Sequence, residues 1–276
     1  MTYKIVVDSS SDLLEMPGVN LANAPLKITS GEREFVDDAN LDVADMVEYL
    51  RGYTGRSSTA CPSAGEWMDA FEDAEQVFCV TITSNLSGAY NSAVVAKNEY
   101  EATYPERKVE VLDSYSTGPE MVLIAEKLVE LIDAGLDVEA VEARIREYME
   151  KTHLLFSLES MDNLAKNGRV SKVAAKAAGI LGIRVVGKAS DVGTLQQLHK
   201  CRGEKKALQT ILAEMEAHGF TGGRIRIAHG LNENGAKALL DVIRSAYPNI
   251  EATIVPFSGL CCFYAERGGL MVGFEG

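Results

Sequence analysis

Residues 77–88 read VFCVTITSNLSG and combine an uninterrupted apolar run with a polar loop. The run Val77–Ile82 has the length of a strand and shows no alternation of polar and apolar side chains, a pattern typical of a buried parallel strand. The loop ends in Ser87 and Gly88, and an alanine-rich helix is expected from there to about Tyr100. The stretch therefore predicts one strand–loop–helix unit of an α/β protein.

The same unit recurs on both sides of this stretch. Tyr3–Val7 reads as a strand that ends in the polar residues Asp8–Asp12, and Val109–Leu112 reads as another strand. Repeated units of this kind predict a parallel sheet with helices on its faces. Further helices are expected at Val43–Leu50, from Pro62 to about Ala74, at Pro119–Ala134 and at Val138–Lys151.

The order of elements changes after residue 152. Strands are expected at Leu154–Ser157, Ile183–Val186, Arg224–Ala228, Ala252–Val255 and Leu270–Phe274, and helices at Lys205–Ala217 and Gly235–Ala246. Ser258–Gly269 is expected to be an irregular loop between the last two strands. We therefore predict two α/β domains, residues 1–152 with a mainly parallel sheet flanked by helices and residues 153–276 with a mixed sheet and helices.

Composition excludes several classes of protein. The chain has 276 residues, of which 46% are hydrophobic and 24% charged, so it can form large cores and is not globally disordered. Its net charge of −13 disfavours general binding of nucleic acid or of an anionic membrane surface. No apolar stretch is long enough for a membrane-spanning helix, and no signal peptide is expected. Five scattered cysteines indicate reduced thiols and a cytoplasmic protein.

Polar loops follow the predicted strands where a parallel sheet binds its ligands. Asp8–Asp12, Ser84–Gly88 and Asp113–Gly118 are rich in hydroxyl groups, and the first two are expected to precede helices. Ser57–Ser63 reads as another hydroxyl-rich helix start. Such segments donate hydrogen bonds to a compact anion, so a phosphate and a carboxylate fit equally well. Each segment taken alone is also explained as a helix cap.

Motifs for catalysis and for cofactors are scarce. The sequence has no Gly-x-Ser-x-Gly elbow, no Walker loop, no Gly-x-Gly-x-x-Gly fingerprint and no His-Glu-x-x-His. Cys261 and Cys262 are adjacent and would point apart on a strand, so a metal site is not expected. A small-molecule enzyme that uses Ser87 or His229 is the less favoured alternative. No cofactor is therefore expected.

Basic residues gather in one segment despite the acidic total. A solvated helix face and a docking surface for an acidic partner or a phosphate group are both compatible with this cluster. Its members are Lys166, Arg169, Lys172, Lys176, Arg184, Lys188, Lys200, Arg202, Lys205 and Lys206.

Taken together, short motifs give the chain a resemblance to the DegV family of bacterial fatty-acid-binding proteins, which includes the FakB subunits of fatty acid kinase. The motifs are DSSSD at residues 8–12, APL at 24–26, STACPS at 58–63, SNLSGAYNSA at 84–93, DS at 113–114, NGRVS at 167–171 and KCRGEKKA at 200–207. They follow the family order over nearly the whole chain. The resemblance implies two α/β domains with a long-chain fatty acid bound between them and its acyl chain in an apolar tunnel.

The resemblance also implies a site and a partner. The carboxylate would be bound by Thr59 and Ser87, with Ser84 and Gly88 in the same loop as Ser87. In the FakB branch the protein is a non-catalytic carrier that presents the acid to a separate kinase. Residues implied for docking of that kinase are Lys166, Arg169, Lys172, Arg202 and Lys205.

The C-terminal loop departs from the family pattern. The family typically has a histidine that contacts the acyl headgroup, and Ala265 stands at that position here. Arg267 is the candidate to replace this contact with a charge-assisted hydrogen bond. A binding protein for another amphiphilic lipid is the alternative that this departure leaves open.

Overall fold

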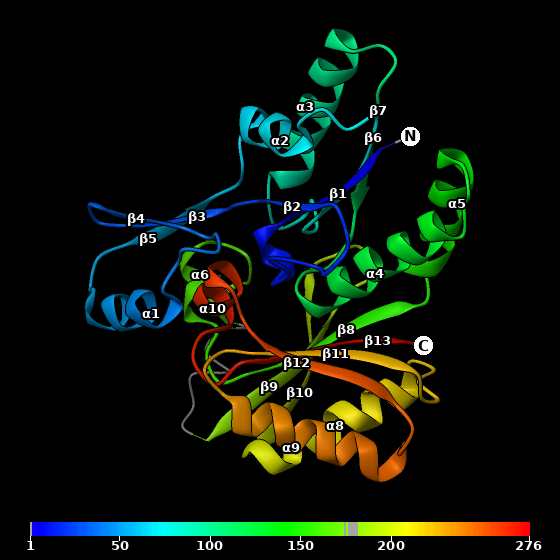
Figure 1. Ribbon diagram of the computed structural model, residues 1–276. Coiled ribbons are helices and arrows are strands. Elements are labelled where there is room, and N and C mark those ends of the chain that lie inside the picture. The colour runs from blue at the N-terminus through cyan, green and yellow to red at the C-terminus, as the bar shows by residue number, and fades with distance from the viewer. Residues whose placement is uncertain (1, 174, 176–181) are drawn as a thin grey trace.

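The first sheet is wholly parallel and contains the strand with which the sequence analysis began. The computed structural model describes residues 2–173, 175 and 182–276 (Figure 1). The sheet has the order β2-β1-β6-β7 and consists of β1 (Tyr3–Asp8), β2 (Leu21–Ala24), β6 (Gln76–Thr81) and β7 (Lys108–Asp113). The strand β6 is central and buried, as its continuous apolar sequence predicts.

Helices cover both faces of this sheet. α2 (Ala64–Phe71) and α3 (Ala89–Thr103) pack against each other, and α4 (Pro119–Asp133) packs against α5 (Val138–Met149). α4 contacts β6 of the first sheet and also three strands of a second sheet below it, β8 (Thr152–Leu158), β11 (Arg224–His229) and β13 (Leu270–Glu275) (Figure 1). It therefore forms a layer between the two sheets, and its many buried residues reflect this position.

The second sheet has six strands and mixed directions. Its order is β10-β9-β8-β13-β11-β12, and β11 and β12 are its parallel pair. The helices α8 (Glu204–Ala217) and α9 (Glu233–Ala246) lie on the face away from α4 (Figure 1). The predicted fold class, a parallel sheet flanked by helices together with a mixed sheet, is confirmed. The strands are β8 (Thr152–Leu158), β9 (Ile183–Ala189), β10 (Leu195–Arg202), β11 (Arg224–His229), β12 (Glu251–Pro256) and β13 (Leu270–Glu275).

Apart from β2, two groups of strands were absent from the sequence prediction. β10 is an edge strand of mainly polar side chains with a bulge between Gln197 and His199, so it lacks the apolar alternation that marks a strand. A third, antiparallel sheet is formed by β3 (Lys27–Ser30), β4 (Arg33–Val36) and β5 (Ser57–Ala60), and α1 (Val43–Gly52) lies between β4 and β5 in sequence.

Three local expectations are wrong. Ser57–Ala60 forms the strand β5, and the helix after it begins at Ala64, where Ser63 and Glu66 form a capping box. The turn after β1 is a single 3-10 turn, Ser9–Ser11, and does not lead into a longer helix.

The third concerns the segment expected to be an irregular loop, which contains α10 (Gly259–Ala265). Asp37 accepts hydrogen bonds from the N–H groups of Gly259 and Leu260, the first two residues of this helix. Ser258 stands at the N-cap but makes no side-chain cap hydrogen bond, and the residue that caps the helix is remote in sequence. Cys261 and Cys262 consequently lie on a helix and not on a strand.

The hydrophobic packing crosses the predicted domain boundary. Thr152 is the first residue of the six-stranded sheet, yet one buried cluster joins Ile28, Phe35 and Met46 to Leu154 and Phe156 of β8. The division into residues 1–152 and 153–276 stays a prediction. Within the described residues, no helix has the length and apolarity needed to cross a membrane.

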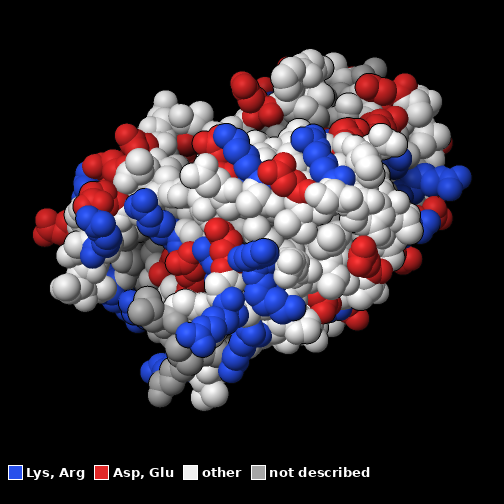
Figure 2. Space-filling model, turned by 90° about the horizontal axis from the view of Figure 1, so that it is seen from below, with Lys and Arg blue, Asp and Glu red and all other residues white. Residues whose placement is uncertain are grey.

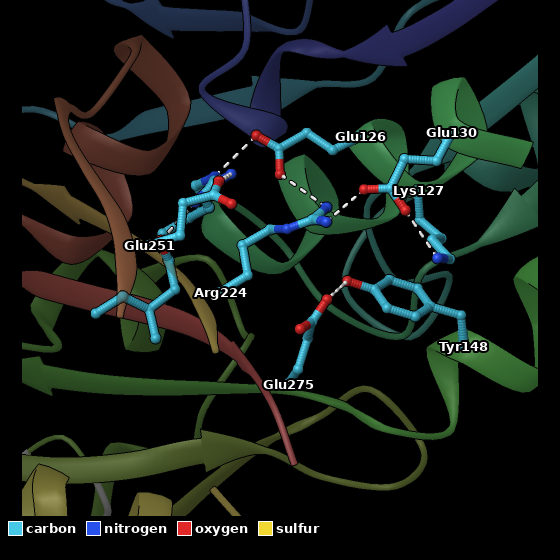
Figure 3. A network of polar contacts seen from close by, with 9 residues as sticks. Glu126, Lys127, Glu130, Tyr148, Arg224, Glu251 and Glu275 are labelled. Carbon is cyan, nitrogen blue, oxygen red and sulfur yellow. Dashed lines mark hydrogen bonds and ion pairs between the residues drawn. The ribbon is translucent and has the colours of Figure 1, made fainter. Parts of the chain in front are cut away.

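Ion pairs connect α4 to the second sheet (Figure 3). Arg226 of β11 binds Glu126 of α4 at 2.8 Å and Glu251 of β12 at 2.6 Å. Arg224 pairs with Glu130 of the same helix, and the phenol of Tyr148 in α5 donates to a carboxylate of β13. These contacts join the helical layer of the first half to β11 and β13 of the second half, and Arg226 also links β11 to β12.

Candidate ligand-binding site

A cavity of about 310 Å³ is lined by residues from both halves of the chain. Its walls are mostly aliphatic or aromatic, so it is suited to an apolar ligand. The larger apolar lining residues are Leu26, Ile82, Leu86, Leu154, Phe156, Leu158, Leu164, Leu195, Leu260 and Met271.

Hydroxyl groups and a guanidinium converge at one part of this cavity. Thr59 of β5 and Tyr264 of α10 are joined by a hydrogen bond of 2.7 Å between their oxygens. The guanidinium of Arg169 lies 5.7 Å from the centre of the Tyr264 ring, and its Nε donates to the carbonyl of Leu86 at 3.1 Å. Ser87 is the next residue in that loop and also lines the cavity. The arrangement offers several donors to one small anion.

The start of α3 adds backbone donors to this group. Ser87 and Gly88 line the cavity immediately before Ala89, the first residue of the helix. Gly88 is the N-cap and provides no side-chain hydrogen bond, whereas the N–H of Ala89 donates to the hydroxyl oxygen of Ser87 at 3.2 Å. The positive end of the helix dipole therefore favours a carboxylate here.

Buried carboxylates hold α10 in position beside the cavity. Asp12 accepts hydrogen bonds from the N–H and the hydroxyl of Ser258, both at 2.7 Å, and Asp37 accepts from the first N–H groups of the helix. Burial raises the pKa of Asp12 to about 7 and also raises the pKa of Asp37. Four residues of α10 line the cavity, so these aspartates fix one of its walls.

The structure separates the residues that the sequence analysis had grouped. Thr59, Ser87 and Gly88 line the cavity, whereas Ser84 does not, and the N–H of Ser84 donates to the carboxylate of Asp113 at 3.2 Å. Arg267 is exposed and lies outside the lining. It follows Glu266, whose φ of 57° ends α10 and turns the chain away from the cavity.

Two other sequence expectations concern catalysis and metals. His229 does not line the cavity with Ser87, and its Nδ1 accepts a hydrogen bond from the N–H of Asn232 at 3.2 Å. The serine–histidine pair is therefore not assembled at this cavity. Among the described residues, no group of three or more potential ligands is placed to hold a metal ion.

The basic residues of the second half fall into two environments. Lys166, Lys172, Arg202 and Lys205 are exposed, and Lys and Arg side chains gather at one end of the face shown in Figure 2. Arg169 is half-buried and lines the cavity, although it was grouped with the exposed residues in the sequence analysis. Lys176 lies outside the described residues.

Tyr264 and Arg169 line the cavity, although neither residue was expected there from the sequence. Arg169 belongs to the motif NGRVS, which could have marked it as part of the site instead of a docking surface. Tyr264 precedes Ala265, and the methyl group of Ala265 lines the cavity at the position where the family typically has histidine. Only the contact with Thr59, which is 205 positions away, reveals the role of this phenol.

Comparisons with known proteins agree with this architecture. The model of the DegV family of uncharacterised proteins matches residues 2–275. A DegV domain-containing protein of Streptococcus pneumoniae is 46% identical, with 100% of this chain and 99% of the relative covered.

Solved structures of two further proteins are similar over their whole length. A DegV family protein from Eubacterium eligens, loaded with heptadecanoic acid, has a TM-score of 0.97 at 44% identity and covers 99% of each chain. The fatty acid kinase B3 protein of Streptococcus pneumoniae, loaded with linoleic acid, has a TM-score of 0.97 at 46% identity and covers 100% of this chain and 99% of that one. The protein described here belongs to the DegV family.

Proposed function

We propose that this protein binds a long-chain fatty acid in the cavity between its two main sheets. The observation that carries the proposal is an apolar cavity with two hydroxyls, a phenol and a guanidinium at one part of its wall. An acyl chain of ~16 methylenes gains about 0.8 kcal/mol for each buried methylene, so the apolar walls supply most of the binding energy. The polar group fixes the carboxylate through charge-assisted hydrogen bonds.

The fatty acids bound by the related proteins support this ligand class. Both similar structures carry an unbranched carboxylic acid with a long chain, and their folds match this one along its full length. Under the proposal, Thr59, Ser87, Tyr264 and Arg169 surround the carboxylate, and Arg267 has no part in the site.

The protein acts as a carrier that presents its fatty acid to a fatty acid kinase. The name of the similar pneumococcal protein supports this role, and the exposed residues Lys166, Lys172, Arg202 and Lys205 form the proposed docking surface for an acidic partner. The carrier provides the bound acid, and the partner provides nucleotide and catalysis. The five unpaired cysteines favour a cytoplasmic location for this exchange.

The test compares hydroxyl groups inside and outside the cavity. Thr59→Val and Ser87→Ala are expected to weaken binding of hexadecanoic acid by about 10- to 100-fold each, because each variant removes a hydrogen bond to a charged group. The dissociation constants are measured by displacement of a fluorescent fatty acid. Ser84→Ala is the matched control in the same loop, and it should bind like the wild type. Equal affinity in all four proteins would contradict the site.

A further inference from the structure

A second cavity, of about 500 Å³, adjoins the first at the start of β8. Leu154 lines both cavities. Side chains alternate along a strand, so Leu158, Phe156, Leu154 and Thr152 all lie on one face of β8. The first three line the apolar cavity, and Leu154 and Thr152 line the second one. The strand thus provides a continuous wall that changes from apolar to polar.

The polar wall is built from buried groups. The hydroxyl of Thr152 donates to Oε1 of Glu120 at 2.8 Å, and each residue is 5% exposed. Glu120 lies in the first turn of α4, directly above this end of the sheet. Burial raises the pKa of its carboxyl to about 7, so near neutral pH the group both donates and accepts hydrogen bonds. A buried pair of this kind can bind a neutral polar group.

The two cations of the second cavity, Lys188 and Arg146, already have partners. Lys188 lies 3.7 Å from Asp191 and 3.2 Å from Nε2 of His218. Arg146 pairs with Glu110 and Glu142 of the first half. Because these cations are neutralised within the protein, the cavity favours a neutral ligand group over a second carboxylate.

We propose that the second cavity binds the polar far end of an acyl chain, so that the protein accepts fatty acids with a hydroxyl or keto group near the methyl end. The inference rests on the proposed function, because the carboxylate has to be bound at Thr59 and Ser87 for the chain to extend past Leu154. Thr152 and Glu120 form the hydrogen bonds to the far group.

Selectivity follows from the cost of burying a hydroxyl group. In a tunnel that ends in apolar side chains, a buried hydroxyl has no partner, and its binding is weakened by about 10- to 100-fold relative to the plain acid. Here Thr152 and Glu120 provide the partner. The affinities for the plain and the hydroxylated acid are therefore expected to differ by no more than about 10-fold.

The experiment measures the ratio of two dissociation constants. Saturated acids of 14 to 20 carbons and their terminally hydroxylated counterparts compete with a fluorescent fatty acid for the full-length protein. In the wild type, at least one hydroxylated acid is expected to bind within about 10-fold of the plain acid of equal length. In Thr152→Val, which keeps the side-chain shape but loses the hydroxyl, the ratio for that pair is expected to rise by about 10-fold.

Two further variants separate a local role from a loss of folding. Thr152→Ser keeps the hydroxyl and is expected to restore the wild-type ratio. Ser157→Ala removes a buried hydroxyl of the same strand that lines neither cavity, and the ratio should not change.

The outcomes distinguish this inference from the proposed function. Tight binding of plain acids together with more than 100-fold rejection of every hydroxylated acid would overturn the inference and leave the proposed function intact. A ratio that is the same in Thr152→Val and wild type would also overturn it. Absence of binding for plain acids of every length would refute the proposed function itself.

Discussion

Tyr264 shows how a departure from a family motif can be compensated by a neighbouring residue. Ala265 brings only a methyl group to the cavity, but the phenol of Tyr264 reaches Thr59 at 2.7 Å from the preceding position of α10. Burial raises the pKa of this phenol, so it stays protonated and can donate to a carboxylate. Under our proposal, a tyrosine therefore supplies the donor that Ala265 lacks.

The raised pKa of Glu120 predicts how the stability of the protein depends on pH. Its pKa is raised from 4.5 to about 7, mainly by burial, so the folded protein holds this proton more tightly than the unfolded chain does. Its contribution to stability is complete below about pH 4.5 and is lost as the pH rises toward 7. Glu120→Gln removes this loss. The free energy of unfolding of the variant, relative to that of the wild type, should increase between pH 5 and 8 by roughly 2–3 kcal/mol.

Urea unfolding at pH 5 and at pH 8 measures this change. Asp69→Asn on α2 serves as the control, because Asp69 is exposed and its substitution should give the same difference from wild type at both values. If the difference in free energy of unfolding between Glu120→Gln and the wild type is the same at pH 5 and pH 8, the carboxyl of Glu120 is ionised throughout the range.

At the scale of elements, the packing of α4 against β13 depends on Gly273. A β-carbon at this position would lie 2.6 Å from the backbone carbon of Pro119 and 2.7 Å from the backbone nitrogen of Glu120. Backbone atoms cannot move aside as a flexible side chain can. Gly273→Ala is therefore expected to reduce the free energy of unfolding by about 1–3 kcal/mol, as measured by urea denaturation.

Gly52→Ala is the matched control for this substitution. Apart from its chain neighbours and the backbone of its own helix, nothing lies within 4 Å of the added β-carbon, and Gly52 is the last residue of α1. Its stability should equal or slightly exceed that of the wild type, because alanine favours the helix. An equally stable Gly273→Ala protein would show that α4 and β13 are not in rigid contact.

At the scale of the whole molecule, the ion pair between Arg226 of β11 and Glu126 of α4 joins the two halves that enclose the cavity. The side chain of Arg226 is 7% exposed, and that of Glu126 is 22% exposed. Arg226→Met leaves the carboxylate of Glu126 largely desolvated and without its closest cation. This variant is expected to lose about 2–4 kcal/mol of stability in urea unfolding.

An exposed ion pair provides the comparison. Arg144 pairs with Glu147 on α5, and both side chains are more than 60% exposed. Arg144→Met should change stability by less than about 1 kcal/mol, because exposed pairs contribute little. If the two variants lose equal stability, the network of Figure 3 is not specifically responsible for joining the halves.

The sequence by itself determined the repeated strand–loop–helix order, the fold class and the family. The apolar run of β6 and the helix after Gly88 depend on local propensity and on burial, and both are visible in a short window of residues. The same is true of the hydroxyl-rich loop that contains Ser87. These features were predictable because neighbouring residues determine them.

Only the tertiary structure decided how the polar part of the cavity is assembled. It joined Tyr264 to Thr59, turned Arg169 inward, left Arg267 exposed, and capped α10 with Asp37. Each of these results depends on partners more than 80 positions away in the sequence, or on the direction in which a chain leaves a helix. Contacts of this kind are created by the packing of sheets and helices against one another, and no local pattern of side chains encodes them.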